Sequence, residues 1–165
     1  EREILKPIRD RADRIIESSA FNVHELRGYL FDNYAEQDRT GSLFVSVVSF
    51  GYKYGIPTES DLLFDVRFLP NPHFVEDLRA KTGLDTEVVA FIEAIEDYQQ
   101  YFQMVFSFLL FLVPRFIKEG KTYLTMSIGC TGGRHRSVSM AQRLGEELGR
   151  QGYRVKTTHR DLWKT

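Results

Sequence analysis

The chain has 165 residues, 22 basic and 23 acidic, so its formal net charge is −1, and 42% of its residues are hydrophobic. This length and apolar content fit one folded domain with a real core and exclude a disordered chain. The single cysteine, Cys130, excludes an internal disulfide framework and a cysteine-rich zinc site, and with no secretory leader in view it predicts a cytoplasmic protein.

Residues 1–20 are polar and helix-prone, and we predict that they are the remnant of a preceding domain or its linker. The main domain is predicted to cover 21–165. It opens with a helix over 23–34, because Asn22 and Glu25 have the spacing of a capping box. A turn is expected at 38–41.

Four short segments are predicted to be strands, the first on the ground of its nearly continuous apolar and β-branched run. They lie at 43–48, 62–67, 123–128 and 153–156. Helical spacing of apolar residues predicts a long helix over 86–118, kinked or ended by Pro114, and a second helix over 137–150. The alternation predicts an α/β fold with a single, mostly parallel sheet and helices on both faces. The most apolar run, Met104 to Val113, is shorter than the ~20 residues of a membrane span, so we predict a core helix and no membrane contact.

Positive charge gathers in the last third of the chain. Residues 1–114 carry 11 basic and 19 acidic side chains, a net charge of −8, whereas 115–165 carry 11 and 4, a net charge of +7, which together give −1. Clustered lysine and arginine favour an anionic or phosphate-bearing partner. The alternative is that these charges only solvate a terminal helix and strand.

The segment 129–137 (GCTGGRHRS) is the most informative stretch, because it joins a predicted strand to a predicted helix. Its glycines allow close backbone approach, and the helix start offers free N–H groups to an anion. We predict that it holds a phosphate through the residues Cys130, Thr131, Gly132, Gly133, His135, Arg136 and Ser137. The alternative is a tight turn whose glycines serve packing alone.

The same segment also fits an enzymatic interpretation. Cys130, Gly133, Arg136 and Ser137 match C-x-x-G-x-x-R-[ST], the loop of cysteine-dependent phosphatases, in which a thiolate attacks phosphorus. Asp65 is the candidate general acid, with Asp61 as an alternative. Those phosphatases usually have a histidine before the cysteine, where this chain has glycine, so catalysis stays the second choice and we predict no enzyme activity.

A second group of polar residues follows the predicted strand at 62–67. Asp65 and Arg67 point to the same side of a strand near its carboxyl end, where α/β sheets bind ligands, and His73 follows a rigid proline. These three residues are predicted to bind the sugar or amine part of a ligand. The alternative is a self-satisfied Asp65–Arg67 ion pair. His24 and His159 have no partner at metal-ligand spacing, and we predict no metal.

Three segments, 49–55 (SFGYKYG), 64–73 (FDVRFLPNPH) and 128–138 (IGCTGGRHRSV), closely resemble the C-terminal domain of the RapZ/YvcJ family of bacterial nucleotide-binding proteins. The resemblance spans about 20–160 in the correct order. It implies a domain similar to a phosphofructokinase subdomain, which follows an N-terminal P-loop domain that binds ATP or GTP and is absent here. This C-terminal part is then expected to need no cofactor of its own.

The resemblance further implies a regulatory domain that senses a phosphorylated amino sugar, glucosamine-6-phosphate or a related nucleotide sugar. It also implies a homo-oligomer and, in RNase-adapter members, binding of small RNA together with an RNase. Adapter members have a strongly basic tail, whereas this chain ends in HRDLWKT, which weakens the RNA prediction. The residues predicted to contact RNA phosphates are Lys53, Arg134, Arg154, Lys156, Arg160 and Lys164.

Overall fold

The computed structural model describes residues 7, 11–21, 26, 29, 30, 33 and 43–164. The chain divides into two compact units, Glu1–Asp38 and Arg39–Thr165. In the first unit a 3-10 turn, η1, spans Ser18–Ala20. Most of the predicted helix at 23–34 lies outside the described residues, although positions 26, 29, 30 and 33 within it are helical. The predicted turn at 38–41 also lies outside them, and the origin of 1–20 as a remnant stays a prediction.

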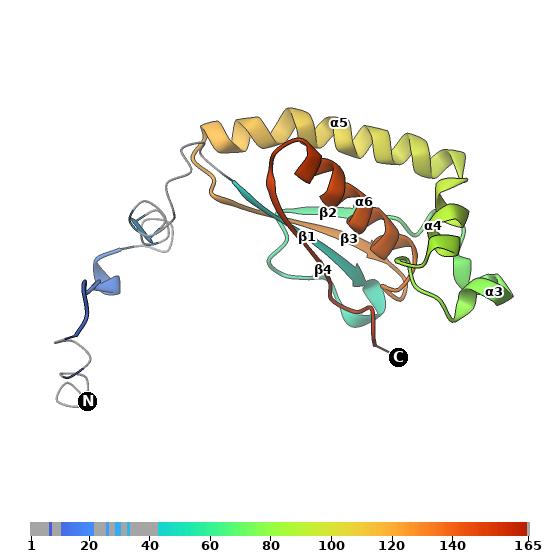
Figure 1. The fold of residues 1–165 in the computed structure, drawn as a ribbon, viewed down its shortest axis with the longest axis horizontal. Coiled ribbons are helices and arrows are strands. Elements are labelled where there is room, and N and C mark those ends of the chain that lie inside the picture. The colour runs from blue at the N-terminus through green and yellow to red at the C-terminus, as the bar shows by residue number, and fades with distance from the viewer. Residues whose placement is uncertain are drawn as a thin grey trace. The chain divides into compact units, whose positions relative to one another are not determined.

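The second unit is built on one parallel sheet of four strands in the order β2-β3-β1-β4 (Figure 1). The strands are β1 (Phe44–Gly51), β2 (Leu62–Asp65), β3 (Tyr123–Cys130) and β4 (Arg154–His159). All four predicted strands are therefore present. In register, Gly51 pairs with Cys130 and Asp65 with Gly129, so the strands that carry the predicted motifs end at one edge of the sheet.

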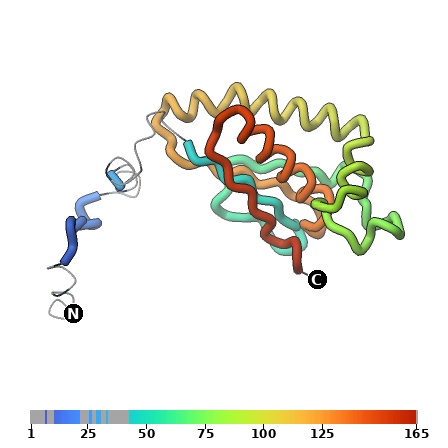
Figure 2. Tube along the Cα trace, viewed as in Figure 1, coloured from blue at the N-terminus to red at the C-terminus, as the bar shows by residue number. Residues whose placement is uncertain are grey.

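The helices lie in the two long connections. Between β2 and β3 come the turn η3 (Pro72–Phe74) and the helices α3 (Glu76–Arg79), α4 (Thr86–Glu93) and α5 (Glu96–Lys118), and α6 (Arg136–Arg150) joins β3 to β4. Figure 2 follows this path, in which α5 runs back along the sheet after α4. The predicted long helix is broken at 94–95 and not at Pro114. The helix continues to Lys118, and Leu109 and Val113, which precede the proline, are buried in the core.

The two faces of the sheet are covered differently. Val47 and Met126 belong to the hydrophobic core that α5 and α6 share, whereas the neighbouring Ser127 points to the other face. There Ser60, in the connection from β1 to β2, lies 2.6 Å from it, Oγ to Oγ. The connection from β1 to β2 moves along the sheet in one direction, whereas the two helical connections, from β2 to β3 and from β3 to β4, move in the other direction. Because connections between parallel strands are right-handed, the first connection lies on the face opposite to the helices.

The predicted single parallel α/β sheet is confirmed. We expected helices on both faces of the sheet, but among the described residues the helices pack on one face. The reason is the connection from β1 to β2, which spans only 52–61 and is too short for a regular crossover helix. The likeness to a phosphofructokinase subdomain stays a prediction.

Candidate anion-binding site

A cleft of about 370 Å³ opens at the carboxyl ends of β1 and β3. It is bounded by the turn η2 (Tyr52–Tyr54), the segment around η3, the loop between β3 and α6, and the C-terminal segment. Its lining residues are Lys53, Tyr54, Asn71, His73, Arg79, Cys130, Thr131, Gly132, Arg134, His135, Arg136 and Lys164. Five of these side chains are lysine or arginine and none is a carboxylate, so the cleft attracts anions.

Glycines let two loops of the site touch each other. Gly133 has a φ of 72°, and a Cβ on it would lie 2.6 Å from the Gly51 nitrogen. A Cβ on Gly51 would in turn lie 2.6 Å from the carbonyl carbon of Gly132. The backbone N–H of Lys53 also donates to the Thr131 carbonyl oxygen at 3.1 Å. Any larger side chain would force these loops apart, and η2 would no longer bound the cleft.

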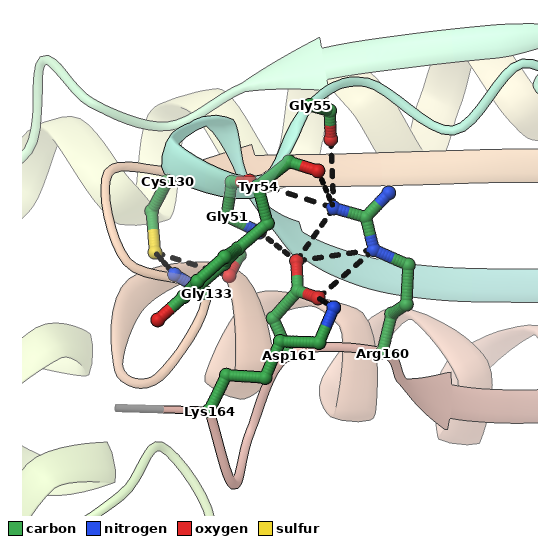
Figure 3. Close-up of polar contacts among 9 residues, drawn as sticks. Gly51, Tyr54, Gly55, Cys130, Gly133, Arg160, Asp161 and Lys164 are labelled. Atoms are coloured by element: carbon green, nitrogen blue, oxygen red, sulfur yellow. Dashed lines mark hydrogen bonds and ion pairs between the residues drawn. The ribbon is translucent and has the colours of Figure 1, made fainter.

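Cys130 lies buried at the base of the loop that follows β3. Its Sγ accepts a hydrogen bond from the Gly133 N–H at 3.2 Å and lies 3.1 Å from the Ser137 Oγ. Figure 3 shows the contact with Gly133. Cys130 and Ser137 thus tie the end of β3 to the first turn of α6, and this tie fixes the curve of the loop.

Arg136 is a buried cation that contacts the cleft. Its guanidinium donates from Nη1 to the carbonyl oxygens of Arg67 and Leu69, at 2.9 and 2.8 Å, and from Nη2 to the Thr131 Oγ1 at 3.2 Å. Its Nε is buried without a hydrogen-bond partner. Burial lowers the pKa of Arg136 because the guanidinium loses hydration. A charge held this way, with neutral partners and no carboxylate in the cleft lining, favours a bound anion.

His135 precedes Arg136 and is also buried, with 6% of its surface exposed. Its Nε2 has no hydrogen-bond partner. Burial lowers the pKa of His135 and outweighs hydrogen bonding with the backbone of Lys81 and Leu78, which acts to raise it; the nearby charges of Arg134 and His73 also lower it. The ring is therefore neutral at pH 7, and an anion bound beside it favours the protonated form.

The cations on the rim are held in place by backbone carbonyls and by one carboxylate. Arg134 donates from Nε to the Lys81 carbonyl oxygen at 3.1 Å, and Arg79 donates from Nε to the His73 carbonyl oxygen at 3.0 Å. Lys164 lies 2.8 Å from the Asp161 carboxylate. Fixing these side chains in advance reduces the entropy that a ligand must remove on binding.

Asp161 anchors the C-terminal segment behind the glycine loops (Figure 3). It is fully buried and accepts hydrogen bonds from the Gly51 N–H at 2.8 Å and from Arg160. Burial raises the pKa of Asp161, but the hydrogen bonds from Arg160, Gly51 and Lys164 outweigh it and lower the pKa to about 2. The carboxylate therefore stays ionised at neutral pH and holds Lys164 at the rim.

The structure places six of the predicted ligand residues in the cleft lining: His73, Cys130, Thr131, Gly132, His135 and Arg136. Gly133 and Ser137 shape the loop from behind. Asp65 and Arg67 form an ion pair with each other at 2.6 Å, and the Arg67 guanidinium lies 3.9 Å from the centre of the Tyr52 ring. The self-satisfied alternative thus describes this pair, and neither side chain lines the cleft.

The predicted RNA residues separate into two groups. Lys53, Arg134 and Lys164 line the cleft beside the predicted ligand residues. Arg154 and Lys156 lie exposed on β4, at the edge of the sheet. Arg160 is occupied, because its guanidinium donates to Asp161 and to the Gly55 carbonyl oxygen at 2.7 Å.

Three lining residues were missed by sequence reasoning: Tyr54, Asn71 and Arg79. Tyr54 and Asn71 lie inside segments that carry the family resemblance, so those segments could have indicated them. Asn71 also caps η3, since its Oδ1 accepts the His73 N–H at 3.3 Å. Arg79 follows no motif, and only the folding of α3 against the loop brings it to the cleft.

The phosphatase interpretation has its nucleophile and arginine near each other, but the cleft lining offers no carboxylate as general acid. Asp65 is occupied by Arg67. Among the described residues no group of three His, Cys, Asp or Glu side chains could hold a metal ion. The arrangement suits holding an anion better than protonating a leaving group.

Comparison with known proteins agrees with these observations. A protein from Acidobacterium capsulatum named "Nucleotide-binding protein" is 47% identical over 162 residues, covering 98% of this chain and 53% of that protein. Proteins of the same name from Desulforamulus reducens and Lachnoclostridium phytofermentans are 42% and 46% identical, over 99% of this chain and 55% and 58% of their own lengths. The chain thus spans just over half the length of these relatives. Residues 43–163, which contain the whole sheet and every residue of the cleft lining except Lys164, match the family described as the RapZ C-terminal domain, and the chain belongs to this family.

Proposed function

We propose that this chain is a regulatory domain that binds a phosphorylated amino sugar, glucosamine-6-phosphate or a related nucleotide sugar, in the cation-lined cleft. The observation that supports it most is Arg136, a buried guanidinium with an unpartnered Nε in a cleft whose lining includes no carboxylate. A phosphate there would gain charge-assisted hydrogen bonds and the favourable end of the α6 dipole.

We expect different residues of the cleft lining to bind the two parts of the ligand, the phosphate and the sugar. Thr131, in the loop after β3, and His135 and Arg136, at the start of α6, would hold the phosphate. Tyr54, Asn71 and His73 also line the cleft and offer hydrogen-bonding groups to the sugar. The chain itself is proposed to need no cofactor, and ATP or GTP binding is assigned to the part of the relatives that this chain does not cover.

Calorimetry with glucosamine-6-phosphate, glucosamine and inorganic phosphate tests the proposal. We expect saturable binding of the phosphosugar, tighter than of phosphate, and none of glucosamine. Replacing Arg136 by Ala should weaken binding by about 1.5–3 kcal/mol, since a charge-assisted contact is lost. Arg143→Ala is the matched control, because this arginine also lies on α6 but pairs with Glu93 at 3.3 Å and does not line the cleft. Equal affinity of both variants would contradict the site assignment.

A second candidate function is binding of single-stranded RNA at the same end of the domain, with an RNase as a further partner. Lys53, Arg134 and Lys164 line the cleft, and Trp163, which is 80% exposed, offers a stacking surface beside them. Fluorescence anisotropy with a short labelled RNA should then show affinity that falls steeply with salt and that phosphosugar competes away. Affinity independent of Lys53 and Lys164 would exclude this surface.

We propose no catalytic role for Cys130. The expected result is no release of nitrophenol from p-nitrophenyl phosphate by the chain, with Cys130→Ser identical to the parent. Turnover that Cys130→Ser abolishes would restore the phosphatase interpretation.

A further inference from the structure

A second pocket, of about 490 Å³, lies between α4 and α6. We call it the α4–α6 pocket. Its walls are Gly83 and Leu84, one side of α4, and the side of α6 that runs from Ser139 to Arg150. Its volume is in the range of sites that bind small molecules. No residue of this lining belongs to the cleft, so the pocket can hold a ligand of its own.

The charge of the α4–α6 pocket is opposite to that of the cleft. Among the described residues its lining contains three carboxylates and two arginines: Glu93, Glu146, Glu147, Arg143 and Arg150. Arg143 pairs with Glu93 at 3.3 Å, and Arg150 pairs with Glu147. Glu146 accepts a hydrogen bond from the neutral Gln142 amide at 2.8 Å and lies 4.0 Å from Arg150. One carboxylate is therefore in excess, and it favours a cationic group in the pocket.

Ser139 provides a second, independent sign of a ligand. It lines the α4–α6 pocket, only 3% of its surface is exposed, and its buried Oγ has no hydrogen-bond partner among the described residues. The hydroxyl of the buried Tyr98, close to Ser139, also has none. A buried hydroxyl without a partner destabilises the fold, and a ligand atom that bonds to it removes this cost.

The distance between these two features limits the shape of the ligand. Ser139 and Glu146 lie on the same side of α6, seven residues apart, which is about 10 Å along the helix axis. Leu84 and Val89 add apolar surface to the same pocket. A ligand that contacts both residues therefore needs a positive end, a polar end and an apolar chain between them. A single amino sugar is too short to bridge this distance.

We propose that the α4–α6 pocket binds a small linear amine that carries a hydroxyl group at its other end. Its ammonium group donates to the Glu146 carboxylate, its hydroxyl exchanges a hydrogen bond with the Ser139 Oγ, and its chain lies against Leu84 and Val89. A primary amine is protonated at neutral pH, so its charge matches the one carboxylate in excess. The inference does not depend on the ligand of the cleft.

Titration of the 165-residue chain with 6-amino-1-hexanol, followed in ¹H–¹⁵N correlation spectra, tests the proposal. We expect saturable shifts of the amides of Gly83, Leu84 and Ser139. The neutral 1,6-hexanediol has the same length and should cause none of them. Shifts centred on Thr131 and Arg136 would place the amine in the cleft, and either this result or no shift at millimolar amine would overturn the proposal.

Glu146→Gln tests the carboxylate that binds the ammonium group. We expect the dissociation constant of 6-amino-1-hexanol to rise roughly fivefold, because a charge-assisted contact at a half-exposed side chain is lost. Glu96→Gln is the matched control, since it removes the same charge from an exposed position on α5 that does not line the pocket. Equal weakening in both variants would reduce the binding to general attraction between charges and would exclude the site.

Ser139→Ala separates a binding role from a packing role. We expect weaker binding of 6-amino-1-hexanol and a melting temperature no lower than that of the parent chain, because the variant loses a hydroxyl that has no partner. A lower melting temperature with unchanged affinity would assign Ser139 to the packing of the core and contradict the proposal.

A lysine side chain of a partner protein has the same alkylammonium chemistry as the proposed ligand. Nα-acetyl-lysine methylamide represents that source, and we expect it to bind more weakly than 6-amino-1-hexanol, because it has no hydroxyl for Ser139 at the end of a chain. Tighter binding of the lysine derivative in the same titration would replace the small amine by a protein partner.

Discussion

Two charged residues of the C-terminal third, Asp161 and Arg136, are both buried, but their partners differ. Asp161 accepts hydrogen bonds from a cation on its own segment and from the Gly51 amide, and a second cation, Lys164, pairs with it. Arg136 has two backbone carbonyls and one hydroxyl, and its Nε has no partner. The charge of Asp161 is neutralised by cations of the same chain. The guanidinium of Arg136 is held in place by neutral groups, which do not neutralise its charge.

The difference separates a structural charge from a binding charge. A fully paired buried ion resists change, because removing either partner leaves the other uncompensated. A buried ion with neutral partners retains most of its field for a ligand. Mutation of cleft residues is therefore expected to change the affinity for the ligand. Mutation in the C-terminal segment is expected to change the stability of the fold.

The largest effect is expected from Asp161→Ala. It leaves the Arg160 guanidinium and the Gly51 N–H without their acceptor, and we expect a loss of about 3–5 kcal/mol in the free energy of unfolding. Denaturant titration followed by circular dichroism measures it. A loss below about 1 kcal/mol would mean that water replaces the carboxylate, and the contrast with Arg136 would fail.

The same carboxylate predicts an acid limit to stability. The pKa of Asp161 is about 2 in the folded chain against an ordinary 3.8, so its contribution is complete above about pH 5 and is lost as the pH falls towards 2. Unfolding curves between pH 5 and 2 should show this loss, and Asp161→Asn should reduce it. An unchanged acid response in Asp161→Asn would assign the loss to other carboxylates.

Gly133→Ala tests the contact between the loops at intermediate cost. The residue has a φ of 72°, and its new Cβ would lie 2.6 Å from the Gly51 nitrogen, so we expect about 1–3 kcal/mol of destabilisation and a weaker cleft. Gly149→Ala on α6 is the control, since a Cβ there meets nothing within 4 Å and alanine favours the helix. Equal melting temperatures of the two variants would show that the loops can separate freely.

A smaller effect is expected from pH on ligand affinity. Burial lowers the pKa of His135 in the free chain, and a bound phosphate raises it, so binding takes up a proton. Affinity for a phosphosugar should increase as the pH falls from 8 to 7, an interval in which the phosphate, with a second pKa of about 6, stays largely dianionic. Calorimetry in two buffers of different ionisation enthalpy measures the proton uptake. His135→Gln should remove it, and uptake that persists in this variant would contradict the assignment to His135.

The smallest effect is expected from Arg67→Gln. This side chain lies exposed against Asp65, where water screens the ion pair, and it does not line the cleft. Unfolding midpoint and phosphosugar affinity should both stay within the scatter of replicates. A clear loss of affinity would return the Asp65–Arg67 pair to the binding site.

Much of the fold and part of the candidate site could be predicted, because the signals are local. The strand runs and the helix after 137 depend on neighbouring residues, and so does the loop of glycines and cations at 129–137. The sequence did not show that Asp65 and Arg160 would be engaged in ion pairs and not in ligand binding, because this depends on which charged group lies within hydrogen-bonding distance after folding. Arg79 was missed for the same reason, since no sequence spacing relates α3 to the loop at 131–135.

The sequence by itself determined the α/β class, the parallel strands and the family, through apolar periodicity and three motif segments. Tertiary structure decided which charges are compensated. Gly51 and Asp161 are 110 positions apart in the sequence, and they form a hydrogen bond only because folding places β1 and the C-terminal segment side by side. The same packing left Arg136 with neutral partners and the Ser139 hydroxyl with none, because burial and its electrostatic consequences are properties of the folded chain.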